Sequence, residues 1–182
     1  MTANLQETKE WYVVHTRSRT EKKVCAELNK KNIECFLPLQ KKLRKWKDRK
    51  KWVEVPLISG YCFVHINRME YDSVLKSDHV VCYITFEGKA AVIRPYEIKQ
   101  LKQMLRQSDF EVTVLNENFT PGQKVEIIKG PLMGLKGELV NCLGRKRFIL
   151  RISQIKNVFS VEVPADSLTG LPDENTIHTI DG

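Results

Sequence analysis

The stretch Pro56-Leu57-Ile58-Ser59-Gly60-Tyr61-Cys62-Phe63-Val64-His65-Ile66 decides the fold. From Tyr61 onward nearly every residue is apolar, which is typical of a strand whose two faces are both covered. Gly60, directly before this run, indicates a bend or a close approach of two backbones. We therefore predict a central strand over residues 61–66, around which the first part of the chain is organised.

The most charged segment of the chain lies just upstream of this strand. Residues 41–51 contain eight Lys or Arg among eleven residues, with Trp46 inside the segment and Trp52 beside it. Cations interleaved with aromatic rings suit phosphate contacts combined with a stacking surface. The alternative is a solvated segment that its charge keeps soluble. The candidate nucleic-acid-binding cations here are Lys41, Lys42, Arg44, Lys45, Lys47, Arg49, Lys50 and Lys51.

Composition narrows the class of protein. The chain has 182 residues, a formal net charge of +8 and a pI near 9.3. The length allows one medium domain or two small ones, and the charge favours an anionic partner, first nucleic acid and then a membrane surface. No apolar run approaches the roughly 20 residues of a membrane helix, and the N-terminus has no signal-peptide core. We expect a cytoplasmic protein.

Catalytic and metal-binding patterns are weak. The five cysteines form no Cys-x-x-Cys pair and the four histidines lack metal-ligand spacing, so we expect reduced, buried thiols and no metal. Ser73-Val74-Leu75-Lys76 fits Ser-x-x-Lys, but the motifs that accompany it in β-lactamases are missing. The glycines at 130, 134 and 137 make no phosphate-binding Walker loop. We expect no enzyme and no cofactor.

The first half of the chain alternates strand and helix patterns. Ser18 and Glu21 have capping-box spacing, as do Asn67 and Glu70, and Pro95 suits a first helical turn. The expected strands are 11–15, 33–39, 52–55, 61–66 and 80–84, and the expected helices are 19–31, 68–77 and one from Pro95 that buries Ile98, Leu101 and Leu105. The strands around the basic segment predict a long β-hairpin. This order predicts an α+β sandwich with a mainly antiparallel sheet over residues 10–107, after a flexible tail at 1–9.

The second half has a different pattern. Residues 108–118 are polar without a helical period, which predicts a linker. Short strands at 124–128, 137–140, 147–152 and 158–163 then alternate with glycine-containing turns. They predict a small all-β barrel over 119–170, near the lower size limit for independent folding, followed by a flexible tail at 171–182.

A second basic patch lies at Thr16–Lys23. Arg17, Arg19 and Lys23, together with free N–H groups at a helix N-terminus, could hold a phosphate or exposed bases. The alternative is ordinary helix capping with exposed charges. Capping is the favoured interpretation for Ser18, and for Arg17 the two alternatives stay open.

Three segments together resemble a known family. Residues 121–140, with glycines at 130, 134 and 137 after Lys129, resemble a KOW motif. Trp11-Tyr12-Val13-Val14-His15-Thr16 and Pro56–Val64 are similar to segments of the NusG N-terminal domain. The resemblance to the NusG family of transcription elongation factors covers about residues 10–170, and it makes Lys129, Gly130, Gly134 and Gly137 the KOW loop.

The resemblance implies a polymerase-binding protein. In NusG-like proteins the first domain binds the clamp helices of the largest RNA polymerase subunit and bridges the DNA cleft. Matching positions are Ile58, Ser59, Tyr61 and Phe63, although family members usually have Phe-Pro where this chain has Ile58-Ser59. Asp72 and Ser73 fall where specialised members use His-Thr-Thr on the β-subunit gate loop. Arg17, Arg19, Thr20 and Lys23 fall where such members meet non-template DNA.

The family implies further partners and a branch. Its KOW domain binds a small-subunit ribosomal protein and, in housekeeping members, the termination factor Rho. Thr16–Glu21 resembles RfaH-like and UpxY-like antiterminators more than housekeeping NusG, and the basic hairpin agrees. We expect a monomeric, operon-specific antitermination factor whose bridging of the cleft disfavours paused polymerase conformations. The alternatives are a housekeeping NusG that recruits Rho and a KOW-type RNA-binding or ribosome-associated protein.

Overall fold

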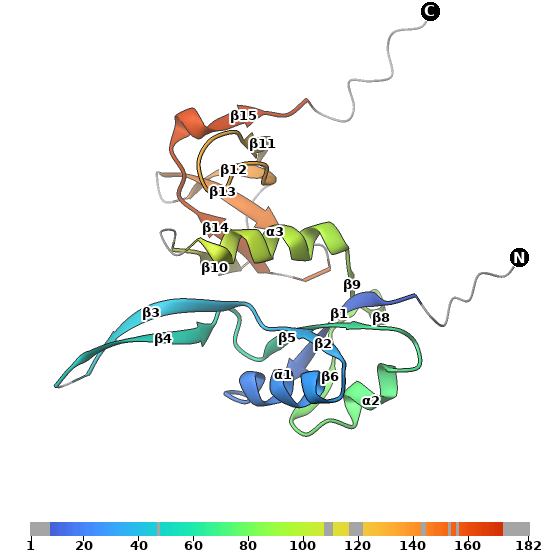
Figure 1. Cartoon of the computed structure of the whole chain (residues 1–182). Helices are drawn as coiled ribbons and strands as arrows, with labels where there is room; N and C mark the ends of the chain where they lie inside the picture. Colours follow the sequence, from blue (N-terminus) through green and yellow to red (C-terminus); the bar gives the residue numbers. More distant parts are fainter. Residues whose placement is uncertain are drawn as a thin grey trace, which may run out of the picture. The chain divides into compact units, whose positions relative to one another are not determined.

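The computed structural model of the chain describes residues 8–46, 48–107, 111–116, 122–142, 145–152, 154–155 and 157–172 (Figure 1). The chain divides into two units. The N-terminal unit comprises Met1–Leu105 and Ile152–Ile155, and the C-terminal unit comprises Arg106–Arg151 and Lys156–Gly182. The predicted α+β class is confirmed: helices occur on a sheet in the first unit, and the second unit is rich in strands.

The sheet of the N-terminal unit is antiparallel throughout. Its strand order is β2 (Glu34–Phe36), β5 (Tyr61–Ile66), β1 (Glu10–Thr16) and β6 (Val80–Tyr83), and β9 (Val92–Ile93) also pairs with β1. Strand β5 is therefore paired on both edges, as predicted for a central strand. Sequence patterning did not predict β7 (Thr85–Phe86), β8 (Lys89–Ala90) or β9, because two-residue strands are too short to show a period.

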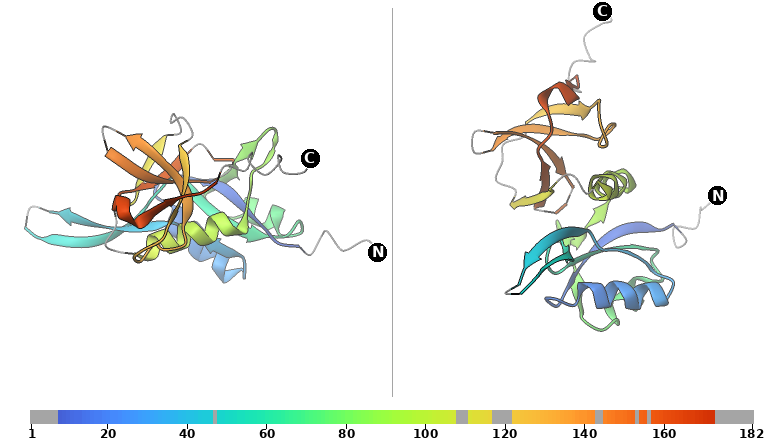
Figure 2. Two further views of the ribbon diagram at one scale, coloured as in Figure 1. Left: turned by 90° about the horizontal axis from the view of Figure 1, so that it is seen from above. Right: turned by 60° about the vertical axis from the view of Figure 1, so that its left-hand side comes forward.

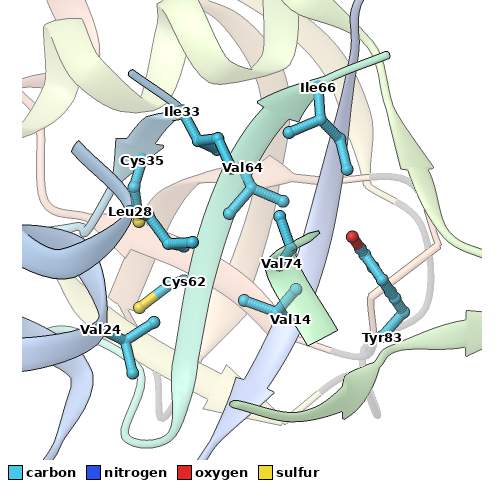
Figure 3. Close-up of a cluster of buried hydrophobic side chains, with 10 residues drawn as sticks. All are labelled: Val14, Val24, Leu28, Ile33, Cys35, Cys62, Val64, Ile66, Val74 and Tyr83. Atoms are coloured by element: carbon cyan, nitrogen blue, oxygen red, sulfur yellow. The ribbon is translucent and has the colours of Figure 1, made fainter. Parts of the chain in front are cut away.

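Both faces of β5 are covered. Cys62, Val64 and Ile66 are fully buried on one face, where they meet α1 (Glu21–Lys30) and α2 (Tyr71–Leu75) (Figure 3). Phe63, also fully buried, points to the opposite face because side chains alternate along a strand. There its ring centroid lies 5.9 Å from that of Phe36.

Helix α3 (Pro95–Arg106) starts at the predicted proline and buries Ile98 and Leu101. Met104 is fully buried and Leu105 is only half-buried, so the prediction for Leu105 was wrong by one position. The helix contacts the sheet through Lys102. The Lys102 Nζ lies 4.8 Å from the Trp11 ring centroid, 5.1 Å from that of Phe36 and 3.3 Å from Glu34 Oε1.

The two predicted capping boxes have opposite outcomes. Asn67 Oδ1 accepts hydrogen bonds of 3.0 Å from the N–H groups of Met69 and Glu70, and Glu70 Oε2 accepts one of 3.0 Å from the Asn67 N–H. The hydrogen bonds of this box are confirmed, but α2 begins at Tyr71 with Glu70 as its N-cap, so the predicted helix start at residue 68 was wrong. The box at Ser18 was wrong, since Thr20 is the N-cap of α1 and makes no side-chain capping bond.

The predicted helix start at residue 19 was also wrong. Arg19 has a φ of 63°, which is outside the right-handed helical region, and α1 begins at Glu21. The Thr20 hydroxyl instead donates a 2.7 Å hydrogen bond to the Arg17 carbonyl.

The basic segment forms the predicted hairpin. Strands β3 (Leu39–Lys45) and β4 (Lys50–Pro56) pair from Leu39↔Pro56 to Lys45↔Lys50. At the turn the Trp46 N–H donates a 2.7 Å hydrogen bond to the Arg49 carbonyl. Figure 1 and the left view of Figure 2 both show this hairpin extending beyond the sheet of its unit.

The C-terminal unit is a six-stranded antiparallel sheet. Its order is β10 (Thr113–Asn116), β14 (Asn157–Val161), β13 (Arg145–Arg151), β12 (Lys136–Cys142), β11 (Gln123–Ile127) and β15 (Leu168–Gly170), with the short 3-10 helix η1 at Ala165–Ser167. Val140, Ile149 and Val158 form a buried cluster with Leu115 packed against it.

Residues 113–116 correct the predicted linker at 108–118, because they pair with β14 as the edge strand β10. Thr113-Val114-Leu115 is too short a run to be recognised among polar neighbours, yet pairing supplies its backbone with partners. Residues 108–110 and 117–118 lie outside the described residues.

The predicted tails are only partly described. Residues 1–7 and 173–182 lie outside the described residues. Lys9 forms a 2.9 Å ion pair with Glu70, and the Leu171 N–H donates a 2.9 Å hydrogen bond to the Lys124 carbonyl. Both residues, which the predicted tails included, therefore have defined partners in the fold.

Four cysteines have described side chains, and all four are free thiols. Cys35 and Cys62 are buried as predicted and Cys25 is half-buried. Cys82 is exposed, which corrects the prediction of buried thiols: it lies on β6, a strand at the edge of the sheet. The Cys142 side chain is outside the described part. Within that part, no helix combines the length and the apolar character that crossing a bilayer requires.

Candidate functional site

Three elements meet at Gly60. Its carbonyl accepts a 2.8 Å hydrogen bond from the Thr16 N–H at the end of β1, and its own N–H donates a 2.7 Å bond to Glu21 Oε1 at the start of α1. Gly60 has a φ of 78°, and a Cβ at this position would lie 3.1 Å from His15 Nε2. The predicted close backbone approach is therefore confirmed, and it fixes the loop that enters β5.

The predicted polymerase-binding residues of this loop and strand differ in exposure. Ser59 is exposed and Tyr61 is half-buried, with its ring edge-on to His15 at a centroid distance of 5.8 Å. Ile58 is 6% exposed and Phe63 is fully buried. Of these four residues, Ser59 and Tyr61 thus present atoms at the surface, whereas Ile58 and Phe63 are buried.

Asp72 and Ser73 belong to a different surface. Both are exposed on α2, whose Val74 packs on the sheet face formed by Cys62, Val64 and Ile66. Tyr61 points to the opposite face, by the alternation of side chains along β5. The structure therefore separates the two predicted protein contacts.

The basic patch at the start of α1 is a turn, here called the basic loop (Arg17–Thr20). Arg17 and Arg19 are exposed, as is Lys23 on the first turn of α1, and Thr20 is half-buried. The Arg17 N–H donates a 2.9 Å hydrogen bond to the His79 carbonyl. Thr16 and Glu21, at the two ends of this loop, are the residues that bind Gly60. The predicted DNA-contacting residues are thus joined to the loop before β5.

The hairpin exposes its charge. All seven described cations of the segment are exposed, and Lys47 lies outside the described residues. The register sets Arg44 opposite Lys51 and Lys45 opposite Lys50. Like charges directly across a strand pair destabilise it. An anionic partner would remove that repulsion.

The KOW segment connects β11 to β12 by a tight loop. Lys129 is exposed, and its Nζ lies 3.5 Å from Asp166 Oδ2. Gly130 and Gly134 have φ values of 82° and 87°, so they adopt a left-handed conformation that glycine favours. A Cβ on Gly137 would lie 2.4 Å from the Ile149 carbonyl oxygen. The predicted glycine-dependent loop is confirmed for Gly130 and Gly134, whereas Gly137 lies within β12, where close packing excludes a Cβ.

Sequence reasoning missed Glu138. Its side chain is 6% exposed and accepts hydrogen bonds from Arg151 Nε at 2.9 Å, the Gly122 N–H at 3.2 Å and Lys124 Nζ at 3.2 Å. Burial raises the pKa of this carboxyl, but the three donors outweigh burial and hold the pKa below its ordinary value. A single Glu within a strand pattern gives no sequence signal that it is a buried acceptor of three hydrogen bonds.

The described residues contain no group of three or more His, Cys, Asp or Glu side chains arranged to hold a metal ion. The N-terminal unit carries a basic loop and a basic hairpin, and it also carries a half-exposed aromatic residue, Tyr61, beside the loop held at Gly60. These features suit binding to a protein and to nucleic acid.

Comparison with solved structures gives three examples of similar chains. Thermotoga maritima NusG is 20% identical with a TM-score of 0.49, over 91% of this chain and 98% of that one. The MjSpt4:Spt5 complex in conformation A gives 15% identity and a TM-score of 0.30, over 88% and 97%. Conformation B gives 16% and 0.30, over 90% and 97%. No curated protein matches the chain significantly.

The comparison with family models is decisive. The model described as transcription termination factor nusG matches residues 9–102, which is more than half of the chain. The matched residues run from the start of β1 into α3, and they include the basic loop, the hairpin and the loop at Gly60. The chain belongs to the NusG family of transcription factors.

Proposed function

We propose that this chain is an operon-specific antitermination factor that binds RNA polymerase across its cleft and suppresses pausing and termination. The observation that carries the proposal is the linkage at Gly60 between the basic loop and the loop before β5. Through it one unit offers a protein-binding surface and a nucleic-acid-binding surface side by side. A factor that bridges the cleft needs both surfaces at once.

The clamp helices of the largest polymerase subunit bind at Ser59 and Tyr61, with Ile58 and Phe63 forming the packed base of the contact. Exposure supports this division, since a half-buried tyrosine on a fixed strand loses little side-chain entropy on binding. Asp72 and Ser73, exposed on α2, form a second and weaker contact with the gate loop.

Non-template or upstream DNA binds the basic loop and the hairpin. Arg17, Arg19 and Lys23 are exposed for phosphate contacts, and Thr20 lies beside them. The hairpin supplies the larger share of the positive charge. If six of its cations meet phosphates, log K falls with log salt at a slope of roughly −4 to −5.

The C-terminal unit recruits a further protein through the KOW loop, with a small-subunit ribosomal protein as the proposed partner. The exposed loop residues Lys129 and Met133, the latter 61% exposed, support a protein contact there. No catalysis, cofactor or membrane is required, and the factor acts as a cytoplasmic monomer. Bridging shifts polymerase away from conformations that open or swivel during a pause.

A general NusG that recruits Rho is the second candidate, favoured by the family model's description as a termination factor. An elongation assay separates the two. Purified chain and cognate RNA polymerase are tested on the leader of the neighbouring operon and on an unrelated template. Readthrough increased on the leader alone supports the specialised factor, and an equal effect on both supports the general one. No effect and no polymerase binding overturn both, and they favour a KOW-type RNA-binding protein.

A further inference from the structure

We propose that one face of the β3–β4 hairpin binds an unpaired nucleic-acid strand by stacking a base on Trp52. The inference rests on the proposed function only in taking the hairpin as a nucleic-acid contact. It adds which face binds and that the bound strand is single.

The hairpin has two different faces. Residues paired across an antiparallel ladder share a face, and successive residues alternate. The register therefore gathers Lys41, Leu43 and Lys45 with Glu54, Trp52 and Lys50 on one side, here called the tryptophan face. The other side, here called the arginine face, holds Lys42 and Arg44 with Val53 and Lys51.

The tryptophan face presents a large apolar pair to its surroundings. Leu43 and Trp52 are cross-strand partners, and they are 49% and 65% exposed. Trp46, at the turn, is 55% exposed. Trp52 exposes most of its surface on a charged strand, which makes its ring a platform on which a flat base can stack.

Cations bracket this apolar pair. Lys45 and Lys50 face each other on its turn side, and Lys41 lies on its other side opposite Glu54. A strand whose base stacks on Trp52 would place phosphates near Lys45 and Lys50, where an anion relieves the repulsion between the two ammonium groups.

The geometry favours an unpaired strand over a duplex. In a duplex the ring faces are stacked on neighbouring bases, so an indole can meet only edges and backbone. An unpaired base offers its ring face, and stacking accepts any base. Within the paired strands the arginine face has no aromatic residue, since Val53 stands where the tryptophan face has Trp52, and Trp46 lies outside the pairing at the turn.

Matched variants of the full chain test the proposal. Labelled oligo-dT and oligo-U of about 12 nucleotides and a duplex of the same length serve as probes. Trp52→Ala should weaken binding of the unpaired probes about tenfold, and Trp52→Phe should retain most of it. The double variant Lys45→Gln/Lys50→Gln should weaken it more than Arg44→Gln/Lys51→Gln, although each removes two charges and one repulsive pair.

Fluorescence gives an independent readout. Trp11 is buried, so quenching by an unpaired probe reports mainly on Trp46 and Trp52, and Trp52→Ala should remove a large part of it. Comparison of oligo-dT with oligo-U shows whether DNA or transcript is the natural source of the strand. The full chain's circular dichroism confirms that each variant is folded.

Unchanged binding by Trp52→Ala, equal losses from the two double variants, or tighter binding of the duplex would each overturn the inference. Its failure is distinct from failure of the proposed function. The latter is judged by elongation with the unaltered chain, whereas these probes are measured without polymerase.

Discussion

Glu21, the first residue of α1, accepts a 2.7 Å hydrogen bond from the backbone N–H of Gly60, the residue before β5. Glu21 is 3% exposed, and the Ser59 hydroxyl lies 3.5 Å from the same oxygen. A negative charge in the first helical turn is favoured by the helix dipole, which helps to offset burial. One side chain therefore fixes the loop that carries Ser59 to the helix that follows the basic loop.

Replacing Glu21 should loosen this junction. We expect Glu21→Ala to lower the free energy of unfolding of the N-terminal unit by about 1–3 kcal/mol, because the Gly60 N–H loses its acceptor while still buried. Glu21→Gln keeps an acceptor oxygen and should cost less. Urea unfolding followed by the fluorescence of buried Trp11 gives the energy, and hydrogen exchange of the Gly60 amide gives the local effect.

Glu27→Ala on the same helix is the control, since its ion pair with Lys31 is solvent-accessible and should be worth about 0–1 kcal/mol. If the Gly60 amide exchanges at the same rate in Glu21→Ala as in the unaltered chain, the hydrogen bond does not fix the loop.

Tyr61 and Phe63 should differ in what they contribute to polymerase binding. Tyr61→Ala should weaken binding with little change in stability, because the ring is half-exposed. Phe63→Ala should lower the stability of the N-terminal unit by about 3–5 kcal/mol, since it leaves a cavity under the surface. Paired measurements of polymerase affinity and urea midpoint distinguish the two effects. A Tyr61→Ala variant that binds as tightly as the unaltered chain would remove Tyr61 from the proposed interface.

Salt dependence decides between the two interpretations of Arg17. If Arg17 meets a phosphate of single-stranded DNA, Arg17→Gln should weaken binding and reduce the slope of log K against log salt by about 0.7. If Arg17 is only an exposed charge beside a helix start, the slope should not change. Lys30→Gln is a matched control, since this exposed cation lies in the last turn of α1. Titrations at several salt concentrations supply the slopes.

Glu138 should make the C-terminal unit sensitive to acid. Its folded-state pKa lies below the ordinary value of 4.5, so its contribution to stability is present above that value and is lost as pH falls through the lowered pKa. Glu138→Gln should lower stability at pH 7 by about 1–3 kcal/mol and flatten the loss below about pH 4.5. Hydrogen exchange of the β12 and β13 amides, followed over a range of pH, measures both the stability at pH 7 and its loss in acid. Glu126→Gln, which removes a 3.9 Å surface pair with Lys136, is the control and should leave the loss of stability in acid unchanged. If Glu126→Gln flattened this loss as much as Glu138→Gln, Glu138 would not be its cause.

Local pattern predicted much of the N-terminal unit. The apolar run from Tyr61 identified the central strand, because only a strand paired on both edges and covered on both faces tolerates that composition. The same spacing that forms a capping box at Asn67 and Glu70 fails at Ser18 and Glu21. The difference is tertiary: Glu21 has a competing donor in Gly60, which is distant in sequence.

The sequence identified the residues of the candidate site by their type, but it did not predict how they are arranged. Charge alone identified the hairpin, but its division into a tryptophan face and an arginine face needed the register. Ile58 and Phe63 were predicted to contact a partner, and sequence could not show that both side chains are buried, since apolar residues suit a core and an interface equally. Glu138 and β10 depend on long-range partners and left no local pattern.

Gly137 provides the sharpest test of the C-terminal unit. A Cβ there would lie 2.4 Å from the Ile149 carbonyl oxygen and 2.6 Å from Phe148 Cζ, and the backbone oxygen cannot move without breaking the β12–β13 ladder. Gly137→Ala should therefore cost about 3 kcal/mol or more. Gly134→Ala meets nothing within 4 Å and should cost only the left-handed strain of about 1–2 kcal/mol at its φ of 87°. Calorimetric unfolding of both variants gives the order. If Gly134→Ala were the more damaging, the loop conformation and not the close packing of β12 on β13 would be what requires glycine in this segment.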